Sequence, residues 1–325
     1  MATNIQTENI ELELSAVIVS VNGFDTPEVL VIKDEKGVAQ LPAGPFDPVN
    51  HTTLELGLRA WIMEQTPFTP GYVEQLYTFG NRGRVAMKGK EAKRVVSVGY
   101  LALTWCEEDQ AERLAPWQSW YEFLPWEDWR QGRPEMIDQH ILPSLKRWIE
   151  TAETQTERTD RKRRCAACFA MRDDGGGWDY EPVLERYELL YSARLLPEVF
   201  RDKGEKLPAV EEHELVPGRS MRYDHRRILA TAIGRLRGKI KYRPVIFELM
   251  PESFTLLQLQ KTMEAIGGYQ LHKQNFRRLL ENNRLVEETG EMSKKTGGRP
   301  AALFQFRKEI LSERVAIGVK MSPSG

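Results

Sequence analysis

Cysteine, net charge and long apolar runs are all scarce in this sequence, and each shortage excludes a class of protein. The three cysteines, Cys106, Cys165 and Cys168, are too few for a disulfide framework and fit a reducing cytoplasm. No apolar run approaches the roughly 20 residues that a membrane-spanning helix needs. The polar, acidic N-terminus lacks the basic start and apolar centre of a signal peptide. We therefore expect a cytoplasmic protein without a membrane partner.

The formal net charge of −1 conceals a separation of charge along the chain. Residues 226–309 carry 17 Lys/Arg and 8 Asp/Glu, whereas the remainder carries 29 and 39. A basic end of this kind is typical of proteins that bind an anionic partner such as nucleic acid. A basic surface that is merely solvated gives the same count, so charge alone leaves both interpretations open.

The first 130 residues alternate apolar runs with one helical pattern, which predicts an α/β domain. Apolar residues three and four positions apart predict a helix over 52–64, with Thr52 or Thr53 as its N-cap. Apolar runs bounded by turn residues predict strands at 16–21, 29–32, 72–79, 94–105 and 120–124. Because 325 residues exceed the usual size of a single core, at least one further domain must follow.

The middle and C-terminal parts predict mainly helices, followed by a hairpin. Helical patterns cover 135–160 and 180–199, and the polar stretch 201–220 is typical of a linker. The C-terminal part then predicts a helix, a strand, two helices around a Gly-Gly turn, and two strands, at 222–239, 244–248, 255–266, 272–283, 285–291 and 302–307. This order is that of a winged helix. It divides the chain into an α/β domain, a helical connecting region and a winged helix domain, at 1–132, 133–220 and 221–325.

The stretch 272–283 has the features of a DNA recognition helix, which needs apolar anchors on one surface and polar side chains on the other. Its anchors are Phe276, Leu279 and Leu280. The residues that suit contacts with base edges are Lys273, Gln274, Asn275, Arg277 and Arg278. Lys294, Lys295 and Arg299 at the hairpin tip suit contacts with phosphates or the minor groove. The alternatives are a solvated basic helix and an RNA-binding or protein-interaction module.

Several phrases of the sequence resemble one family, the Nudix-related transcriptional regulators of NAD metabolism (NrtR/NadQ-like). In the C-terminal part these are FTLLQLQ, NFRR and GGRPA, preceded by MRYDHRRILATAIGRLRGKIKY. In the first domain they are EQLYTFGNRGR and RVVSVGYLALT. The added segment 155–215 suits the longer, NadQ-like subgroup.

The resemblance implies a fold, a set of partners and a function. The fold is an α/β Nudix-like domain plus a C-terminal winged helix-turn-helix domain, with a helical middle segment. The partners are a second copy of the chain, double-stranded operator DNA near NAD-biosynthesis genes, and a nucleotide effector that alters DNA affinity. ADP-ribose, NAD and ATP remain alternatives for that effector, and no cofactor is required. The function is that of a transcriptional regulator, most simply a repressor.

A catalytic Nudix box has the form G-x5-E-x7-R-E-U-x-E-E-x-G, in which U is a bulky aliphatic residue and the glutamates hold Mg²⁺. Aligning Gly44 and Arg59 with this motif requires one extra residue in the loop and places His51 at the first glutamate. Ala60 and Met63 then replace two further acidic positions.

Thr66 replaces the closing glycine of the box, and Glu64 alone keeps its acidic position, with Glu55 and Asp47 nearby. We therefore expect no catalytic residue, no metal site and no hydrolase activity. A nucleoside diphosphate hydrolase with residual activity is the alternative.

An anionic effector needs cationic and aromatic contacts in the first domain. Arginine suits phosphate geometry, and the aromatic residues of strand 72–79 suit stacking on a base. The resulting candidates are Arg59, Glu64, Tyr77, Phe79, Arg82, Arg84 and Arg94. Tyr77 and Phe79 are equally explained as core residues, and Glu64 as a surface residue or as an ion-pair partner of Arg59.

Four other features have a plain structural explanation beside a functional one. Cys165 and Cys168 have the spacing of metal ligands, but without a second pair they are better explained as incidental thiols. The basic run 161–164 suits either DNA phosphates or solvent. Asp224–His225 resembles a catalytic dyad or a helix cap. The tryptophans of 117–129 suit a domain or dimer interface, or core packing.

Overall fold

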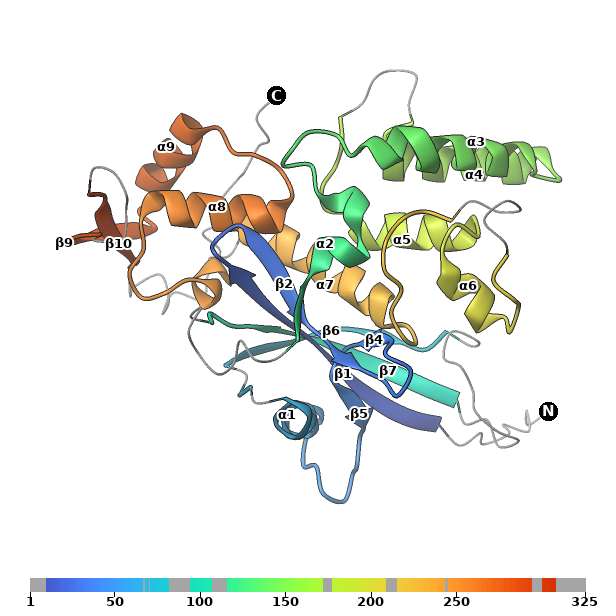
Figure 1. Cartoon of the computed structure of the whole chain (residues 1–325), viewed down its shortest axis with the longest axis horizontal. Helices are drawn as coiled ribbons and strands as arrows, with labels where there is room; N and C mark the ends of the chain where they lie inside the picture. The colour runs from blue at the N-terminus through green and yellow to red at the C-terminus, as the bar shows by residue number, and fades with distance from the viewer. Residues whose placement is uncertain are drawn as a thin grey trace, which may run out of the picture.

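The computed structural model describes residues 10–66, 68–69, 71–81, 94–106, 116–171, 177–208, 215–242, 245–293 and 300–307. Their arrangement is a central sheet with a helix on each face, a helical region beside it and a separate helix-and-hairpin unit at one end (Figure 1). No helix in these ranges is both long enough and apolar enough to cross a bilayer.

The central sheet is mixed and has six strands in the order β6-β7-β1-β2-β8, with β5 also paired to β1. The strands are β1 Ile10–Asn22, β2 Thr26–Leu30, β5 Ala43–Pro45, β6 Tyr72–Phe79, β7 Arg94–Leu103 and β8 Trp117–Ser119. β1 and β7 run parallel, and the other pairs are antiparallel. A short hairpin of β3 (Ile32–Lys33) and β4 (Ala39–Gln40) follows β2.

Helices cover both faces of this sheet because β1 is apolar on both sides. Leu14 and Ile18 point to one face, where α1 (Leu54–Gln65) packs through Leu58 and Ile62. The valines at odd-numbered positions of β1 point to the other face, which is covered by α7 (His225–Tyr242). Burial on both sides explains why β1 has an apolar run rather than a clean alternation. The predicted helix 52–64 is confirmed, and the Thr53 side chain caps it by accepting a hydrogen bond from the Leu56 N–H.

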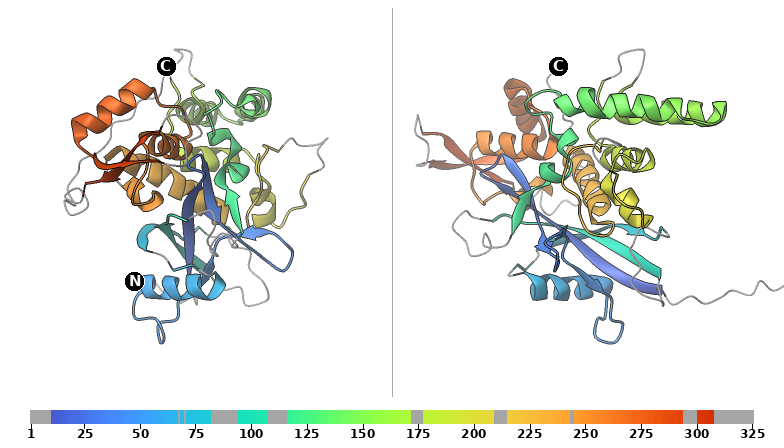
Figure 2. Two further views of the ribbon diagram at one scale, coloured as in Figure 1. Left: turned by 60° about the vertical axis from the view of Figure 1, so that its left-hand side comes forward. Right: turned by 45° about the vertical axis from the view of Figure 1, so that its right-hand side comes forward.

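The chain between β8 and α7 forms a series of helices. They are α2 Trp120–Phe123, η2 Pro125–Glu127, η3 Ile137–Ile141, α3 Leu142–Glu150, α4 Gln155–Phe169, α5 Val183–Ser192 and α6 Pro197–Asp202. α3 and α4 lie side by side and project from the molecule, whereas α5 lies along α7 (Figures 1 and 2). Trp120 and Trp126 are fully buried here, so core packing explains these two tryptophans.

Two predicted strands are wrong. Most of the predicted strand 120–124 forms α2 instead, because β8 ends at Ser119, whose hydroxyl caps the helix, and Trp120, Tyr121 and Phe123 are all buried rather than alternately exposed. Residues 244–248 were expected as a strand, but Val245–Leu249 is a 3₁₀ helix, η4. A short apolar run has no periodicity of its own, so its tertiary neighbours decided its conformation in both cases.

Two predicted helices are interrupted. The pattern 135–160 is divided between α3 and α4, because the Thr154 side chain accepts a hydrogen bond from Glu157 N–H and starts a new helix. The pattern 180–199 is divided between α5 and α6, where Arg194 has a φ of 60° that ends the first helix.

The C-terminal unit has the predicted layout of a winged helix. After η4 come α8 (Leu256–Gly267), α9 (Lys273–Asn283), β9 (Val286–Met292) and β10 (Ala302–Phe306), with β9 and β10 antiparallel. A capping box formed by Thr255 and Gln258 starts α8. Phe254 bridges to Phe304 of β10, which fixes the hairpin against the start of α8.

Candidate nucleic-acid interface and effector site

Helix α9 presents the predicted recognition residues to solvent. Its apolar anchors Phe276 and Leu280 are each 2% exposed and pack into the core of the unit. All five predicted contact residues of the helix are exposed: Lys273, Gln274, Asn275, Arg277 and Arg278. The helix therefore has one buried apolar side and one outer side that carries donors suited to base edges.

The hairpin that follows α9 is acidic on its first strand. Glu287, Glu288 and Glu291 of β9 are exposed, and Glu287 accepts a hydrogen bond from Gln305 at 2.8 Å. The predicted basic tip residues Lys294, Lys295 and Arg299 lie outside the described residues. Their contact with DNA therefore stays a prediction.

Part of the basic charge counted in 226–309 is buried inside the protein. Arg226 and Arg237 are 0% and 3% exposed. Arg226 pairs with Glu198 and Arg237 with Glu127, at 3.2 and 2.7 Å. These arginines neutralise buried carboxylates, so the charge that faces a DNA partner is smaller than the sequence count indicates.

The outer surface of α1 lacks a cluster of carboxylates. Met63 is 55% exposed and lies where the Nudix box would have a glutamate. Arg59 pairs with Glu55 at 2.9 Å and donates to the Gly71 carbonyl, whereas Glu64 is exposed. Within the described part of the chain, no three His, Cys, Asp or Glu side chains are arranged to hold a metal ion.

Three other effector candidates gather at the far end of β6. Tyr77 is 58% exposed, and its ring makes an edge contact with buried Phe79 at 5.3 Å between centroids. Arg94 donates to the Gly80 carbonyl at 3.2 Å. Arg59 contacts Gly71 instead, before β6 begins. The eight residues of β6 extend about 25 Å at the usual rise per strand residue, so one small ligand does not reach both groups.

Arg82 and Arg84 lie outside the described residues, so their place relative to Tyr77 and Arg94 stays a prediction.

A buried polar cluster that no sequence motif indicates lies beside Phe79 on the α7 face of the sheet. Glu13 of β1 pairs in register with Ser97 of β7, whose hydroxyl donates to Glu13 Oε1 at 3.3 Å, as does that of Ser15. His225 accepts the Leu41 N–H at Nδ1 (2.9 Å), so its proton is on Nε2, 3.8 Å from Glu13 Oε1. Burial would raise the pKa of Glu13, but His225 and the two serines outweigh it and hold that pKa below its usual value.

Asp224 and His225 do not form a dyad. Asp224 pairs with Arg227 at 2.9 Å, and His225 binds the backbone of Leu41. His225 thus ties the start of α7 to the residue that follows β4, whereas Asp224 pairs with the first turn of α7 itself, and these contacts support the capping and packing explanation.

The side chains of the remaining candidate motifs are buried or contact other parts of the protein. Cys165 and Cys168 are buried free thiols, and burial raises their pKa to about 12 and about 11, so they stay protonated at neutral pH. In the basic run of α4, Arg161 lies 4.5 Å from the Trp148 ring centroid and Arg163 pairs with Asp160.

A hollow of about 760 Å³ opens between β6, the start of α5 and α7. Its charged lining consists of four carboxylates and two cations: Glu74, Asp179, Glu181, Glu185, Arg235 and Lys239. Because negative charge exceeds positive charge, the hollow repels an anionic nucleotide.

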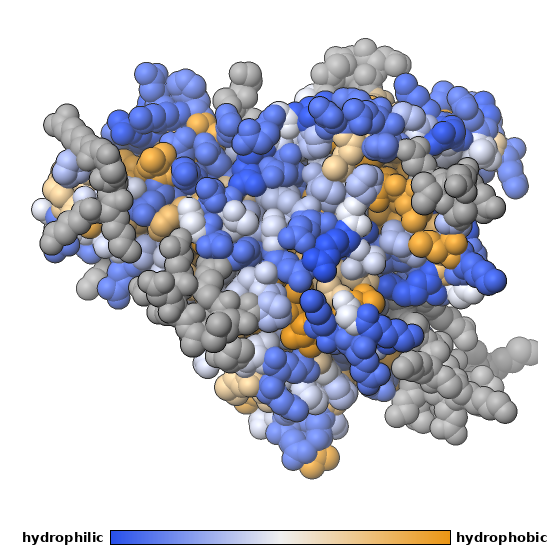
Figure 3. All heavy atoms as spheres, viewed as in Figure 1, coloured by the Kyte–Doolittle hydropathy of each residue, from blue (hydrophilic) through white to orange (hydrophobic). Residues whose placement is uncertain are grey.

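The face seen in Figure 3 is mostly hydrophilic where its residues are described, with apolar residues in small separate patches.

Comparison with known proteins gives matches at two scales. Residues 246–306 match the family described as the NrtR DNA-binding winged helix domain. The "ADPR responsive transcriptional repressor NtrR" of Acinetobacter baylyi is 43% identical over 84 residues, which cover 26% of this chain and 33% of that protein. The alignment thus spans about a third of the length of this curated relative.

Solved structures match nearly the whole chain. Shewanella oneidensis NrtR, in a crystal structure with a 27mer DNA, gives a TM-score of 0.53 over 93% of this chain and 95% of its own. A second crystal structure of the same protein gives 0.51. Both are 20% identical to this chain, a level at which the likeness shows the fold. The chain therefore has the expected fold of an α/β Nudix-like domain joined to a winged helix, and its residues 246–306 match the NrtR DNA-binding winged helix family.

Proposed function

We propose that this protein is a transcriptional repressor of NAD-biosynthesis genes that binds operator DNA through α9. The observation that carries the proposal is the outer surface of α9, where five polar or basic side chains are exposed above two buried anchors. The family match of 246–306 and the repressor named in Acinetobacter baylyi support it.

A homodimer is the expected assembly, because two-fold symmetry presents two recognition helices to a pseudo-palindromic operator. An effector that binds one dimer arrangement preferentially would change the spacing of these helices and hence operator affinity.

ADP-ribose is the first candidate effector, since the Acinetobacter baylyi relative is described as ADPR responsive. NAD and ATP remain alternatives. We place the effector site at the end of β6 that carries Tyr77, Phe79 and Arg94, because the Tyr77 ring is exposed toward this end of the strand and the Arg94 guanidinium contacts Gly80, the residue after it. The acidic hollow beside α7 has the wrong sign of charge for these ligands.

Hydrolase activity is not expected, because Ala60 and Met63 stand at acidic positions of the Nudix box. The alternative is residual hydrolysis supported by Glu64 and Glu55. Incubation with ADP-ribose and Mg²⁺, followed by chromatography of the products, tests this. Release of AMP above the rate of a Glu64→Gln/Glu55→Gln variant would establish the enzyme.

DNA binding is tested by fluorescence polarisation on duplexes selected from a random library by the wild-type protein, against scrambled duplexes. An Arg277→Ala/Arg278→Ala variant should lose at least tenfold in affinity for the selected duplex, since each base contact contributes about 1–3 kcal/mol. A Lys203→Ala/Lys206→Ala variant removes the same charge from exposed positions after α6 and should bind like the wild type. Equal affinity of both variants would place the interface elsewhere.

The effector site is tested by thermal unfolding with ADP-ribose, NAD or ATP. A ligand at 100 times its Kd should stabilise the wild type by about 2.7 kcal/mol. Arg94→Ala should abolish the rise in Tm, whereas Arg59→Ala, at the opposite end of β6, should keep it. The reverse pattern would move the site to α1.

A further inference from the structure

The turn between α8 and α9 is held by the chain segment that follows the edge strand β8. We call this segment, residues 121–130, the clasp. The Tyr121 hydroxyl donates to Ala265 O at 2.7 Å, and the Trp129 N–H donates to Gly268 O at 2.7 Å. Gln270 in turn donates to the Arg130 carbonyl at 2.8 Å. These contacts fix the backbone immediately before the recognition helix.

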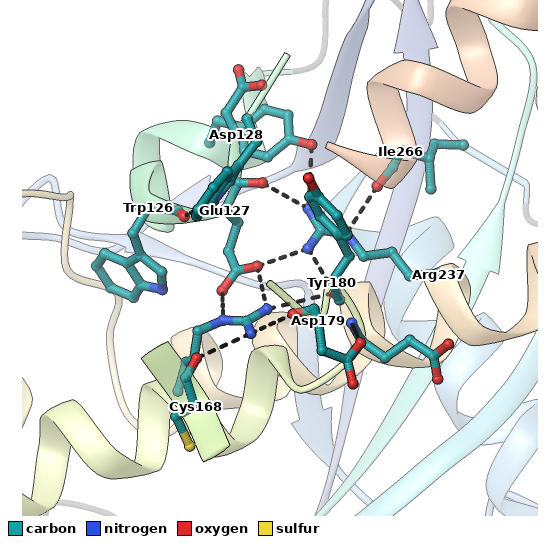
Figure 4. Close-up of polar contacts among 12 residues, drawn as sticks. Trp126, Glu127, Asp128, Cys168, Asp179, Tyr180, Arg237 and Ile266 are labelled. Atoms are coloured by element: carbon teal, nitrogen blue, oxygen red, sulfur yellow. Dashed lines mark hydrogen bonds and ion pairs between the residues drawn. The ribbon is translucent and has the colours of Figure 1, made fainter. Parts of the chain in front are cut away.

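One buried carboxylate organises the clasp. Glu127 is 0% exposed and accepts hydrogen bonds from Arg186 of α5 at 2.6 and 2.8 Å. It also accepts one from Arg237 of α7 at 2.7 Å, a contact shown in Figure 4. Burial alone would raise the pKa of Glu127, but the two arginines outweigh it and keep that pKa below its usual value. The carboxylate is therefore charged at neutral pH.

Arg237 also forms a hydrogen bond with the winged helix unit. Its Nε donates to Ile266 O at 3.0 Å, at the C-terminal end of α8, and its Nη2 donates to Glu127 O at 3.0 Å. Tyr180 O, in the segment that precedes α5, accepts from the same guanidinium at 2.9 Å (Figure 4). A single side chain thus joins the sheet edge, the helical region, α7 and the helix-turn-helix.

Gly268 shows how closely the parts approach. Its φ of 78° favours glycine, and a Cβ there would lie 2.5 Å from Arg237 Nη2 and 3.0 Å from the Tyr121 hydroxyl. The turn leaves no space for a side chain, so it cannot shift relative to the clasp without breaking these contacts.

We propose that Glu127 and Arg237 are positioning residues that set the orientation of α9 relative to the sheet, so that a change in the sheet or the helical region reaches DNA through the clasp. The DNA-binding test of this inference rests on the proposed function, whereas the test of the orientation of α9 does not. Neither residue contacts DNA, since both are buried behind the turn.

The inference is tested with Tyr121→Phe, which removes one hydroxyl from the clasp, and with Glu127→Gln. Tyr191→Phe is the matched control, because its hydroxyl binds Asp202 within the helical region at 3.2 Å. The orientation of α9 is measured as the spin-label distance distribution between Met63→Cys and Lys273→Cys, diluted with unlabelled protein. The native cysteines are all buried, so labelling is selective. Tyr121→Phe should broaden or shift the distribution, and Tyr191→Phe should leave it unchanged.

The DNA readout uses selected duplexes that carry one or two half-sites. Tyr121→Phe should keep wild-type affinity for one half-site but lose about five- to tenfold on two, as expected for one buried hydrogen bond. Unchanged distances in both Tyr121→Phe and a folded Glu127→Gln would overturn the inference. Altered distances with no selective DNA binding by the wild type would overturn the proposed function and keep the clasp.

Discussion

Buried charges decide the behaviour of this protein at the scale of single residues. Glu127 and Glu198 are buried, and each forms an ion pair with arginine inside the fold. The Asp202 side chain is also buried, at 2% exposed, but its arginine neighbour does not keep its pKa low. Burial, helped by Asp224, outweighs Arg201 and Tyr191 and raises the pKa of Asp202 to about 6. Its carboxyl therefore titrates near physiological pH.

Asp202 should make the protein less stable as pH rises through its titration range. Its pKa is 3.8 unfolded and about 6 folded, so between these values the folded state binds more protons and stability falls with pH. From pH 5 to pH 7.5 the wild type should lose about 1 kcal/mol relative to Asp202→Asn. Urea unfolding of both proteins at the two pH values measures this. Parallel changes would show that Asp202 does not carry the effect.

Helix starts are the clearest features at the scale of elements. Thr53 caps α1, Thr154 caps α4, and Thr255 forms a capping box with Gln258 at α8. Each satisfies backbone N–H groups that have no partner within the helix. In α9, where His272 makes no side-chain cap, the buried anchors and the preceding turn hold the helix instead. The stability of α9 therefore comes from packing.

Replacing Thr255 with alanine should destabilise the protein by about 1 kcal/mol, the usual effect of losing an N-cap. Thr255 is 7% exposed and its hydroxyl accepts the Gln258 N–H at 3.2 Å. Exposed Thr52, one residue before the cap of α1, is the control, and its alanine variant should stay within about 0.5 kcal/mol of the wild type. Chemical denaturation measures both, and equal effects would show that the cap at α8 is not special.

At the scale of the whole molecule, the clasp makes one cooperative unit from parts that the sequence separates. The chain has eight tryptophans, all at or before Trp178, so fluorescence reports on the sheet, the clasp and the helical region, and no tryptophan lies within α8, α9 or the hairpin. Circular dichroism at 222 nm reports on all helices, including α8 and α9. The two signals together reveal whether the winged helix unfolds with the rest.

Both signals should give the same urea midpoint in the wild type, as two-state unfolding requires. In Glu127→Gln they should separate, because Arg186 and Arg237 lose their charged partner and hold the clasp, with the winged helix attached to it, less firmly to α5 and α7. Separate midpoints already present in the wild type would show that the clasp does not couple the two parts.

The sequence alone determined the elements whose signals are local. The helix periodicity of 52–64 and 272–283, the strand at 72–79 and the closing hairpin were all predictable, because periodicity and turn residues act over a few positions. The outward placement of Arg277 and Arg278 also followed from helix geometry once Phe276 was recognised as an anchor.

Tertiary structure decided the rest, because the deciding partners are distant in sequence. Residues 120–124 are helical, against their β-like composition, since every large side chain there is buried. Glu127 meets Arg186 and Arg237 across 59 and 110 positions, and His225 meets Leu41 across 184. No local pattern marks an arginine as buried, because its desolvation is offset only by a carboxylate that the fold brings to it. The sequence therefore predicted which helix contacts DNA, and the fold alone decided what holds that helix in place.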